Sequence, residues 1–232
     1  MILEDRTFIL GLISNIMEKI ITSDGSVTYR SSDVGECYHT HSGAVEEAFE
    51  KHAKPAGAEI LAAKQDRIVI FDVCFGLGYN AAAAVDLIKK INPDCRIVVY
   101  GFENDQNIID KILDVDPAFE SFNLFKKIVK THTIEEGNVK IRIFLGDARE
   151  LIKESDEMAD MVFFDPFSPK KVPHMWTKEF LEDVAAKMKV GAALTTYSCA
   201  RMVRDNMKSA GFEVKDGPII GRRSPSTIAV KK

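Results

Sequence analysis

The stretch from Arg67 to Ala81 constrains the fold of this chain more than any other. It begins with Ile68 to Phe71, an unbroken apolar run whose length and β-branched content are typical of a strand buried on both faces of a parallel sheet. Gly76 and Gly78 follow, and strong helix-forming sequence begins at Ala81. A strand, a glycine turn and a helix start in this order predict the nucleotide-binding turn of a doubly wound α/β domain.

Acidic residues near the ends of two predicted strands strengthen this interpretation. The glycine turn alone is a weak signal, because a turn without any ligand has the same sequence pattern. Asp72 ends the first strand, and Glu103 ends the next one, Arg96 to Glu103. A carboxylate there can accept hydrogen bonds from both ribose hydroxyls of an adenosine, although a charged strand terminus without a ligand stays an alternative.

The alternation of strands and helices continues to the end of the chain. Further strands are expected over residues 139–145, 159–164 and 191–198, helices over 177–188 and 200–210, and a closing antiparallel hairpin over 212–215 and 227–230. This order of seven strands resembles a Rossmann-like class I S-adenosylmethionine-dependent methyltransferase rather than a dehydrogenase. We therefore expect an α/β, doubly wound domain over residues 56–232.

Residues 1–55 are expected to form a small lid element beside that domain. Apolar residues near helical spacing predict an amphipathic helix over Glu4 to Ile21. Asp24-Gly25 lies between β-prone segments and predicts a hairpin over Thr22 to Tyr29. A second helix is expected from Gly43 to about Pro55.

Composition excludes several classes of protein. With 46% hydrophobic and 28% charged residues among 232, the chain has the composition of a soluble globular protein. Its four cysteines stand alone and favour reduced thiols over a zinc site. His39 and His41 have no evident third partner, so we interpret them as the polar lining of a crevice and expect no metal. No apolar run is long enough for a membrane span, which predicts a cytoplasmic protein without a membrane partner.

Charge is distributed unevenly along the chain. Residues 1–164 contain 18 Lys and Arg against 28 Asp and Glu, whereas residues 165–232 contain 13 against 7. The net charge of −4 argues against indiscriminate nucleic-acid binding, but the basic last part could present one face to phosphate. A solvated helix surface is the alternative interpretation.

Two further acids follow predicted strands. Asp147 is placed to cap a helix that begins at Ala148, and a cap at that strand end is compatible with a contact to adenine. Asp165 precedes a loop in which prolines restrain the backbone, so its carboxylate and a neighbouring carbonyl can be aimed at one spot. Such acceptors suit an amine, and Phe167 could stack on a planar base, although a merely rigid loop stays possible.

Several motifs together resemble the methyltransferase domain of the tRNA 5-methylaminomethyl-2-thiouridine biosynthesis protein, the MnmC-like family. The resemblance covers residue 22 to the end of the chain, and its most specific part is Asp165 to Trp176. The other motifs are Asp24-Gly25-Ser26, Glu36 to Thr40, Gly43 to Glu47, Cys74 to Asn80, Ala210-Gly211-Phe212 and Gly221-Arg222. Cys74 departs from the glycine that many methyltransferases have there.

The resemblance implies methyl transfer from S-adenosylmethionine to the aminomethyl nitrogen of a modified wobble uridine in tRNA. It implies that Asp165 lies beside the transferred methyl group and that the cofactor is held by Gly76, Gly78, Asn80, Glu103 and Asp147. Asp72 and Ala148, which adjoin the same strand ends, are also expected to bind the cofactor. The expected substrate contacts, some of them to the anticodon stem-loop, are Tyr38, Phe167, Lys170, Lys171, Arg201, Arg204 and Arg222. The oxidase domain of bifunctional members has no counterpart in this sequence, so any oxidative trimming of a precursor is expected elsewhere or not at all.

Two other functions stay open from the sequence. An aminopropyltransferase or small-amine methyltransferase would combine the same sheet with an acid-rich site. A non-catalytic module that binds the cofactor or RNA would share the glycine turn. Steep salt dependence of binding would favour an RNA substrate, because phosphate contacts release counterions.

Overall fold

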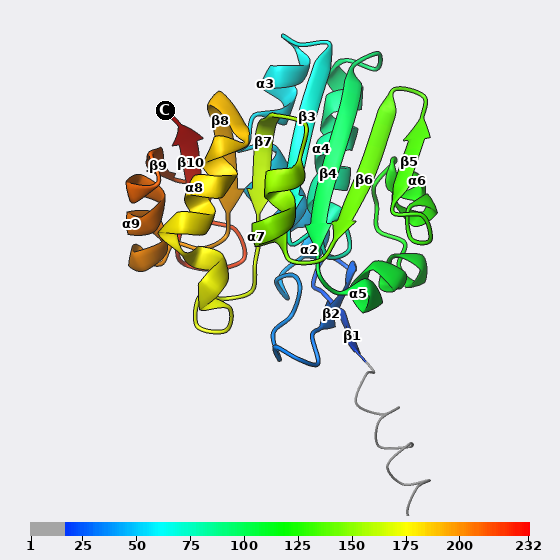
Figure 1. Ribbon diagram of the computed structural model, residues 1–232. Coiled ribbons are helices and arrows are strands. Elements are labelled where there is room, and N and C mark those ends of the chain that lie inside the picture. Colours follow the sequence, from blue (N-terminus) through cyan, green and yellow to red (C-terminus); the bar gives the residue numbers. More distant parts are fainter. Residues whose placement is uncertain (1–16) are drawn as a thin grey trace, which may run out of the picture.

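The computed structural model describes residues 17–232, and its centre is an eight-stranded sheet (Figure 1). The strand order is β5-β6-β4-β3-β7-β8-β10-β9. The strands are β3 (Arg67–Val73), β4 (Arg96–Glu103), β5 (Thr133–Glu136), β6 (Val139–Leu145), β7 (Ala159–Phe164), β8 (Met188–Thr196), β9 (Phe212–Asp216) and β10 (Thr227–Lys231). The five strands from β6 to β8 in this order are parallel, which confirms the predicted doubly wound sheet.

Helices cover both faces of the sheet. On one face lie α2 (Ala44–Glu47), the π-helix η1 (Ala48–Ala53), α3 (Ala58–Ala62), α4 (Tyr79–Ile91), α5 (Gln106–Asp110), η2 (Lys111–Asp114) and α6 (Phe122–Lys127). On the other lie α7 (Ala148–Leu151), η3 (Ile152–Glu154), η4 (Pro173–Trp176), α8 (Lys178–Ala186) and α9 (Arg201–Ser209). In β3, Ile68 and Ile70 pack in the first core and Val69 and Phe71 in the second, because successive side chains point to opposite faces.

The edges of the sheet are antiparallel. As predicted, β9 and β10 form a closing hairpin, and β10 inserts between β9 and β8. At the other edge, β5 pairs antiparallel with β6 and was not predicted. Its sequence, with two glutamates in four mostly exposed residues, has no apolar alternation to indicate a strand.

The N-terminal hairpin consists of β1 (Glu18–Ile21) and β2 (Val27–Arg30) and lies below the carboxyl ends of the sheet strands in Figure 1. It confirms the turn at Asp24-Gly25. The helix expected over Glu4 to Ile21 is wrong at its end, where β1 is a strand, because pairing with β2 satisfies the backbone of these β-branched residues. The rest of that expected helix lies outside the described residues.

Asp24 connects the hairpin to the following helix. Its carboxylate accepts hydrogen bonds from the Thr22 hydroxyl at 2.6 Å, the Ser26 hydroxyl and N–H, and the N–H of Glu46 in α2 at 3.1 Å. Although burial raises it, these hydrogen bonds lower the pKa of Asp24 to about 2. The helix expected from Gly43 is confirmed as α2 and η1. No helix within residues 17–232 is long and apolar enough to cross a membrane.

Candidate active site

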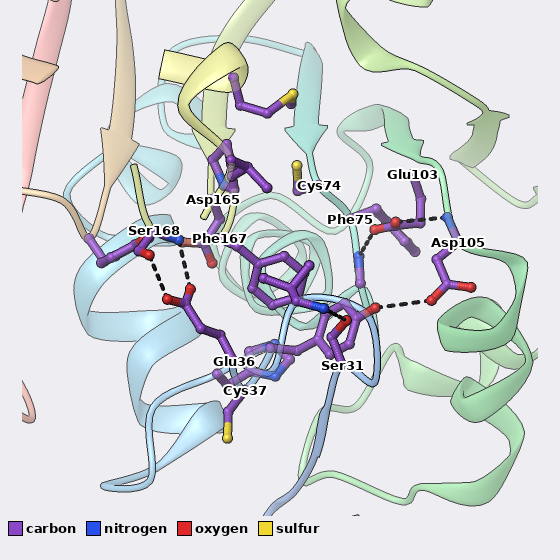
Figure 2. Close-up of a pocket in the computed structure, with 18 of the residues that line it drawn as sticks. Ser31, Glu36, Cys37, Cys74, Phe75, Glu103, Asp105, Asp165, Phe167 and Ser168 are labelled. Carbon is purple, nitrogen blue, oxygen red and sulfur yellow. Dashed lines mark hydrogen bonds between the residues drawn. The ribbon is translucent and has the colours of Figure 1, made fainter. Parts of the chain in front are cut away.

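A cavity of about 670 Å³ opens at the carboxyl ends of the parallel strands. It lies where the strand order reverses beside β3, which is the ligand crevice of doubly wound sheets. One wall comes from the loops after β3, β4, β6 and β7. The facing wall comes from residues 31–43 between β2 and α2, which we call the lid loop (Figure 2).

Glu103 anchors the glycine turn to the end of β4. Its Oε2 accepts from the N–H of Gly76 at 2.9 Å, and its Oε1 accepts from the N–H groups of Asn104 and Asp105 at 2.9 and 3.1 Å. A carboxylate has about four acceptor positions, so one on Oε2 is left for a ribose hydroxyl. Burial nevertheless raises the pKa of Glu103 above its ordinary value. Glu103 was expected to accept from both ribose hydroxyls, and its remaining acceptor position leaves room for one direct hydrogen bond.

The glycine turn takes the left-handed backbone that its sequence predicts. Gly76 and Gly78 have φ values of +54° and +74°, and a Cβ at Gly78 would lie 2.6 Å from the Phe75 ring. Cys74 also has a left-handed φ, +65°, which is a glycine conformation occupied by a larger residue. Gly76 and Cys74 line the cavity, whereas Gly78 lies outside the lining that the described residues form.

Asn80 and Asp72 flank the start of α4. Asn80 lines the cavity and donates from Nδ2 to Asp165 Oδ2 at 3.2 Å. Its buried Oδ1 has no hydrogen-bond partner within residues 17–232, so it is free to accept from a ligand. Asp72 is fully buried and accepts from the N–H of Ala81 at 3.2 Å. Burial raises the pKa of Asp72 well above its ordinary value. Asp72 is not among the described residues that line the cavity.

Asp147 caps α7, as predicted, by accepting from the N–H of Arg149 at 3.0 Å. The Arg149 guanidinium also binds this carboxylate and holds the pKa of Asp147 below its ordinary value. Asp147 and Ala148 both line the cavity. Their contact with adenine stays a prediction.

Asp165 follows β7 directly and faces the same cavity. Burial, and next the negative charge of Glu47, raise the pKa of Asp165 to about 6. The loop after it is rigid because the buried Trp176 donates from Nε1 to the carbonyl of Phe167 at 2.9 Å. That hydrogen bond takes one acceptor position of the Phe167 carbonyl, while the Asp165 carboxylate lines the cavity.

Sequence reasoning did not identify two of the buried polar residues near Asp165, Glu47 and Lys51. Glu47 and Lys51 form a buried ion pair, and the Lys51 ammonium outweighs burial to hold the pKa of Glu47 below its ordinary value. A third residue, His39, lines the cavity, as predicted; it is buried, stacks on Tyr79 at 4.8 Å, and has a pKa that burial lowers. The signal that was available is the i, i+4 spacing of Glu47 and Lys51, which alone indicates an ordinary surface pair.

The lid loop is tied to both sides of the cavity. The Glu36 carboxylate accepts from the N–H and the hydroxyl of Ser168 at 2.8 and 2.5 Å, as Figure 2 shows. Tyr38 donates its hydroxyl to Asp105 at 3.3 Å and packs edge-on against Phe167, with 5.0 Å between ring centroids. Tyr38 and Phe167 therefore lie together in the cavity wall, and their contact with a base stays a prediction.

The expected basic substrate contacts are scattered. Arg222 lines the cavity and lies over the Tyr197 ring at 5.5 Å, while Lys170 and Lys171 are exposed beside the Asp165 loop. Arg204 is bound within the fold to Asp216, Thr227 and Ser226, and Arg201 is exposed near Asp205. In the described chain, Arg201 and Arg204 stand apart from the cavity lining. Their role with substrate stays a prediction.

Known proteins share this sequence and geometry. A family model of S-adenosyl-L-methionine-dependent methyltransferases matches residues 116–232. The crystal structure of MnmC2 from Aquifex aeolicus is 31% identical, covers 94% of this chain and 70% of that chain, and has a TM-score of 0.85. An uncharacterized protein of Methanocaldococcus jannaschii is 29% identical over 230 residues, which are 95% of this chain and 62% of that protein.

A further relative is the tRNA 5-methylaminomethyl-2-thiouridine biosynthesis bifunctional protein MnmC of Pseudomonas fluorescens. It is 30% identical over 170 residues, which are 68% of this chain but 26% of that protein. The fold and the family model define an S-adenosyl-L-methionine-dependent methyltransferase. Within that class, the chain belongs to the MnmC-like family, as its motifs predicted.

The residues at the cavity fit the cofactor of this class, S-adenosyl-L-methionine. The free acceptor position on Glu103 Oε2 suits a ribose hydroxyl, and the unpartnered Oδ1 of Asn80 suits an ammonium group. The left-handed Gly76 keeps the backbone of the turn open, with the Tyr38 ring 3.4 Å from where its Cβ would lie. The cavity is also large enough for a ligand of drug-like or nucleoside size.

Proposed function

We propose that this protein transfers a methyl group from S-adenosyl-L-methionine to the aminomethyl nitrogen of a modified wobble uridine in tRNA. The observation that carries the proposal is the position of Asp165, a buried carboxylate directly after β7 that faces the same cavity as Glu103. The related MnmC protein, which is named for the biosynthesis of 5-methylaminomethyl-2-thiouridine in tRNA, supports the choice of acceptor.

Asp165 can prepare an amine for attack. An alkylammonium has a pKa near 10.4, like lysine, so the site must remove one proton before the nitrogen can act as a nucleophile. With its pKa raised to about 6, Asp165 is a carboxylate at neutral pH and a better proton acceptor than an ordinary aspartate. The N–H bond breaks, its electron pair stays on nitrogen, and the proton moves to the Asp165 carboxylate.

The cofactor, when bound, supplies an electrophilic methyl carbon on a sulfonium sulfur. The residues of this chain hold the two reactants in one place, which is the main requirement for a displacement that needs no other catalyst. Glu103 and Asn80 hold the cofactor, and Asp165 orients the amine. Tyr38 and Phe167 frame the base, and the lid loop forms the wall of the cavity that faces the strand ends.

The basic residues near the mouth of the cavity support tRNA as the partner. Lys170 and Lys171 are exposed on the loop that carries Asp165, and Arg222 lines the cavity from the opposite segment. Phosphates on either side of an everted wobble base would meet such side chains. We infer that the anticodon stem-loop binds across this mouth.

A small-amine methyltransferase is the second candidate, and the acidic lining of the cavity favours it. That lining includes Asp33, Glu36, Asp105, Asp147 and Asp165. A polyamine would bind these acids directly and would not need the basic rim. Binding of tRNA should weaken steeply with salt through phosphate contacts, and the slope should decrease in a Lys170→Ala, Lys171→Ala double variant.

The experiment is transfer of labelled methyl to tRNA with and without an aminomethyl wobble base, in parallel with spermidine as acceptor. We expect label only in the aminomethyl tRNA. Asp165→Ala should reduce turnover at least about 100-fold, the contribution typical of a general base, while cofactor affinity changes little. Label in spermidine but not in tRNA would overturn the tRNA proposal, and full activity of Asp165→Ala would overturn the role of Asp165.

A further inference from the structure

We propose that His52 is a positioning residue for Asp165, to which its Nε2–H donates a hydrogen bond while Thr195 holds the other ring nitrogen. This inference rests on the proposed function, in which Asp165 accepts a proton from the amine. It assigns a task to a buried histidine that touches neither cofactor nor substrate. It also explains how a buried carboxylate stays ionised at neutral pH.

The geometry places the three side chains in a row. His52 is fully buried in the π-helix η1, a type of element often found at functional sites. Its Nε2 lies 3.6 Å from Asp165 Oδ2, and its Nδ1 lies 3.3 Å from the hydroxyl of the fully buried Thr195. The first distance is slightly longer than a hydrogen bond, as catalytic contacts often are before the ligands bind.

Nε2 needs a partner, and Asp165 is the one it faces. Within residues 17–232, this buried nitrogen makes no hydrogen bond, and leaving a buried polar group unpaired destabilises the fold. Burial lowers the pKa of His52 to about 4, so its ring is neutral and carries one proton. If the Thr195 hydroxyl donates to Nδ1, that proton resides on Nε2 and points to the carboxylate.

The other groups around Asp165 show in which direction a hydrogen bond from His52 changes the pKa of Asp165. The titratable groups that face it come from every surrounding element: Glu47 of α2, Lys51 of η1, His39 of the lid loop, Asp72 of β3, and Cys74 and Tyr197 after β3 and β8. Burial and Glu47 raise the pKa of Asp165, whereas His39, the hydrogen bond from Asn80 and Lys51 lower it. A donor at Nε2 stabilises the charged carboxylate and so opposes the rise.

The test is the pH dependence of kcat/KM for methyl transfer in His52→Leu, His52→Gln and Thr195→Val. We expect the acid limb of His52→Leu to lie about one pH unit above that of the wild type, which is about a tenfold loss at acid pH that shrinks toward pH 8. His52→Gln keeps an N–H donor near Nε2, so its limb should return close to the wild-type position. The acid limb of Thr195→Val should lie between those of His52→Leu and His52→Gln.

A purely structural role for His52 would lower activity equally at all pH values and would not be rescued by His52→Gln. A folded His52→Leu protein whose acid limb is unmoved overturns the inference. Should His52→Leu fail to fold, nitrogen NMR of the wild-type imidazole decides: a proton on Nε2 whose resonance moves in Asp165→Asn supports the inference, and a proton on Nδ1 overturns it. This measurement needs no methyl acceptor, whereas failure of the proposed function appears as no transfer to aminomethyl tRNA by the wild type.

Discussion

Replacing Asp165 by Asn should make the protein more stable at neutral pH, although it removes the proposed proton acceptor. The side chain of Asp165 is 11% exposed, and its pKa is raised from an ordinary 3.8 to about 6, first by burial and next by Glu47. The native protein therefore holds this proton more tightly than the unfolded chain does. Between those two pKa values the native state binds more protons, so the free energy of unfolding falls as pH rises.

The raised pKa gives the size of the effect. At about 1.4 kcal/mol for each pKa unit, ionised Asp165 costs the native state about 3 kcal/mol above pH 6. Below pH 3.8 the carboxyl is protonated in both states and the cost disappears. Asn has the same shape without the charge and can still accept from Asn80 Nδ2, so the variant avoids the cost. We expect Asp165→Asn to be more stable by about 2–3 kcal/mol at pH 8 and equally stable near pH 3.5.

Urea unfolding at several pH values, followed by circular dichroism, measures this difference. Asp160, at the other end of β7, is the matched control, because its buried carboxylate is already satisfied by Lys189 at 2.7 Å and by the N–H of Val69 at 2.8 Å. Asp160→Asn breaks that ion pair and should destabilise the protein. The reasoning is refuted if Asp165→Asn is no more stable than the wild type at pH 8, or if its gain is the same at pH 3.5.

Two further predictions concern the lid loop and the glycine turn. Glu36→Gln loses one of the two acceptors for Ser168, so the lid loop should loosen. Loss of this hydrogen bond, worth about 1–1.5 kcal/mol, should make cofactor dissociation about fivefold to tenfold faster in a stopped-flow measurement. An unchanged rate would show that this contact does not hold the lid loop. Cys74 has a φ of +65°, so Cys74→Gly should be more stable than Cys74→Ala by about 1 kcal/mol in urea unfolding, because alanine keeps the left-handed strain. Equal stability of the two variants would contradict this prediction.

The parallel centre of the fold was predictable because burial on both faces leaves a continuous apolar run. Ile68 to Phe71 shows this pattern, since its alternate residues enter two separate cores and neither face tolerates a polar side chain. The edges were less predictable. In β5 most side chains are exposed, and in β1 Ile21 is 74% exposed, so the apolar pattern there does not report which residues pair.

The site likewise contains residues that could be predicted from the sequence and residues that could not. Asn80, Glu103 and Asp165 were found because the carboxyl ends of parallel strands, and the helix start beside them, meet at one edge. Lys51 and His52 were not found, because no local pattern states which face of a short helix packs under a neighbouring loop. Only the assembled fold turns a charged residue of η1 toward the inside, where Lys51 is 2% exposed.

The buried acids of this site differ in how many donors they receive, and that difference assigns their roles. Glu103 accepts from three backbone N–H groups, although burial still raises its pKa, and Glu47 accepts from Lys51 and the N–H of Thr40. Both carboxylates therefore have more donors than Asp165. Asp72 has one backbone donor, and burial raises its pKa well above the ordinary value. Asp165 lies between these cases, with Asn80 as donor and His52 nearby. A group charged at neutral pH yet still able to take a proton has to be compensated incompletely, and in this cavity that description fits Asp165.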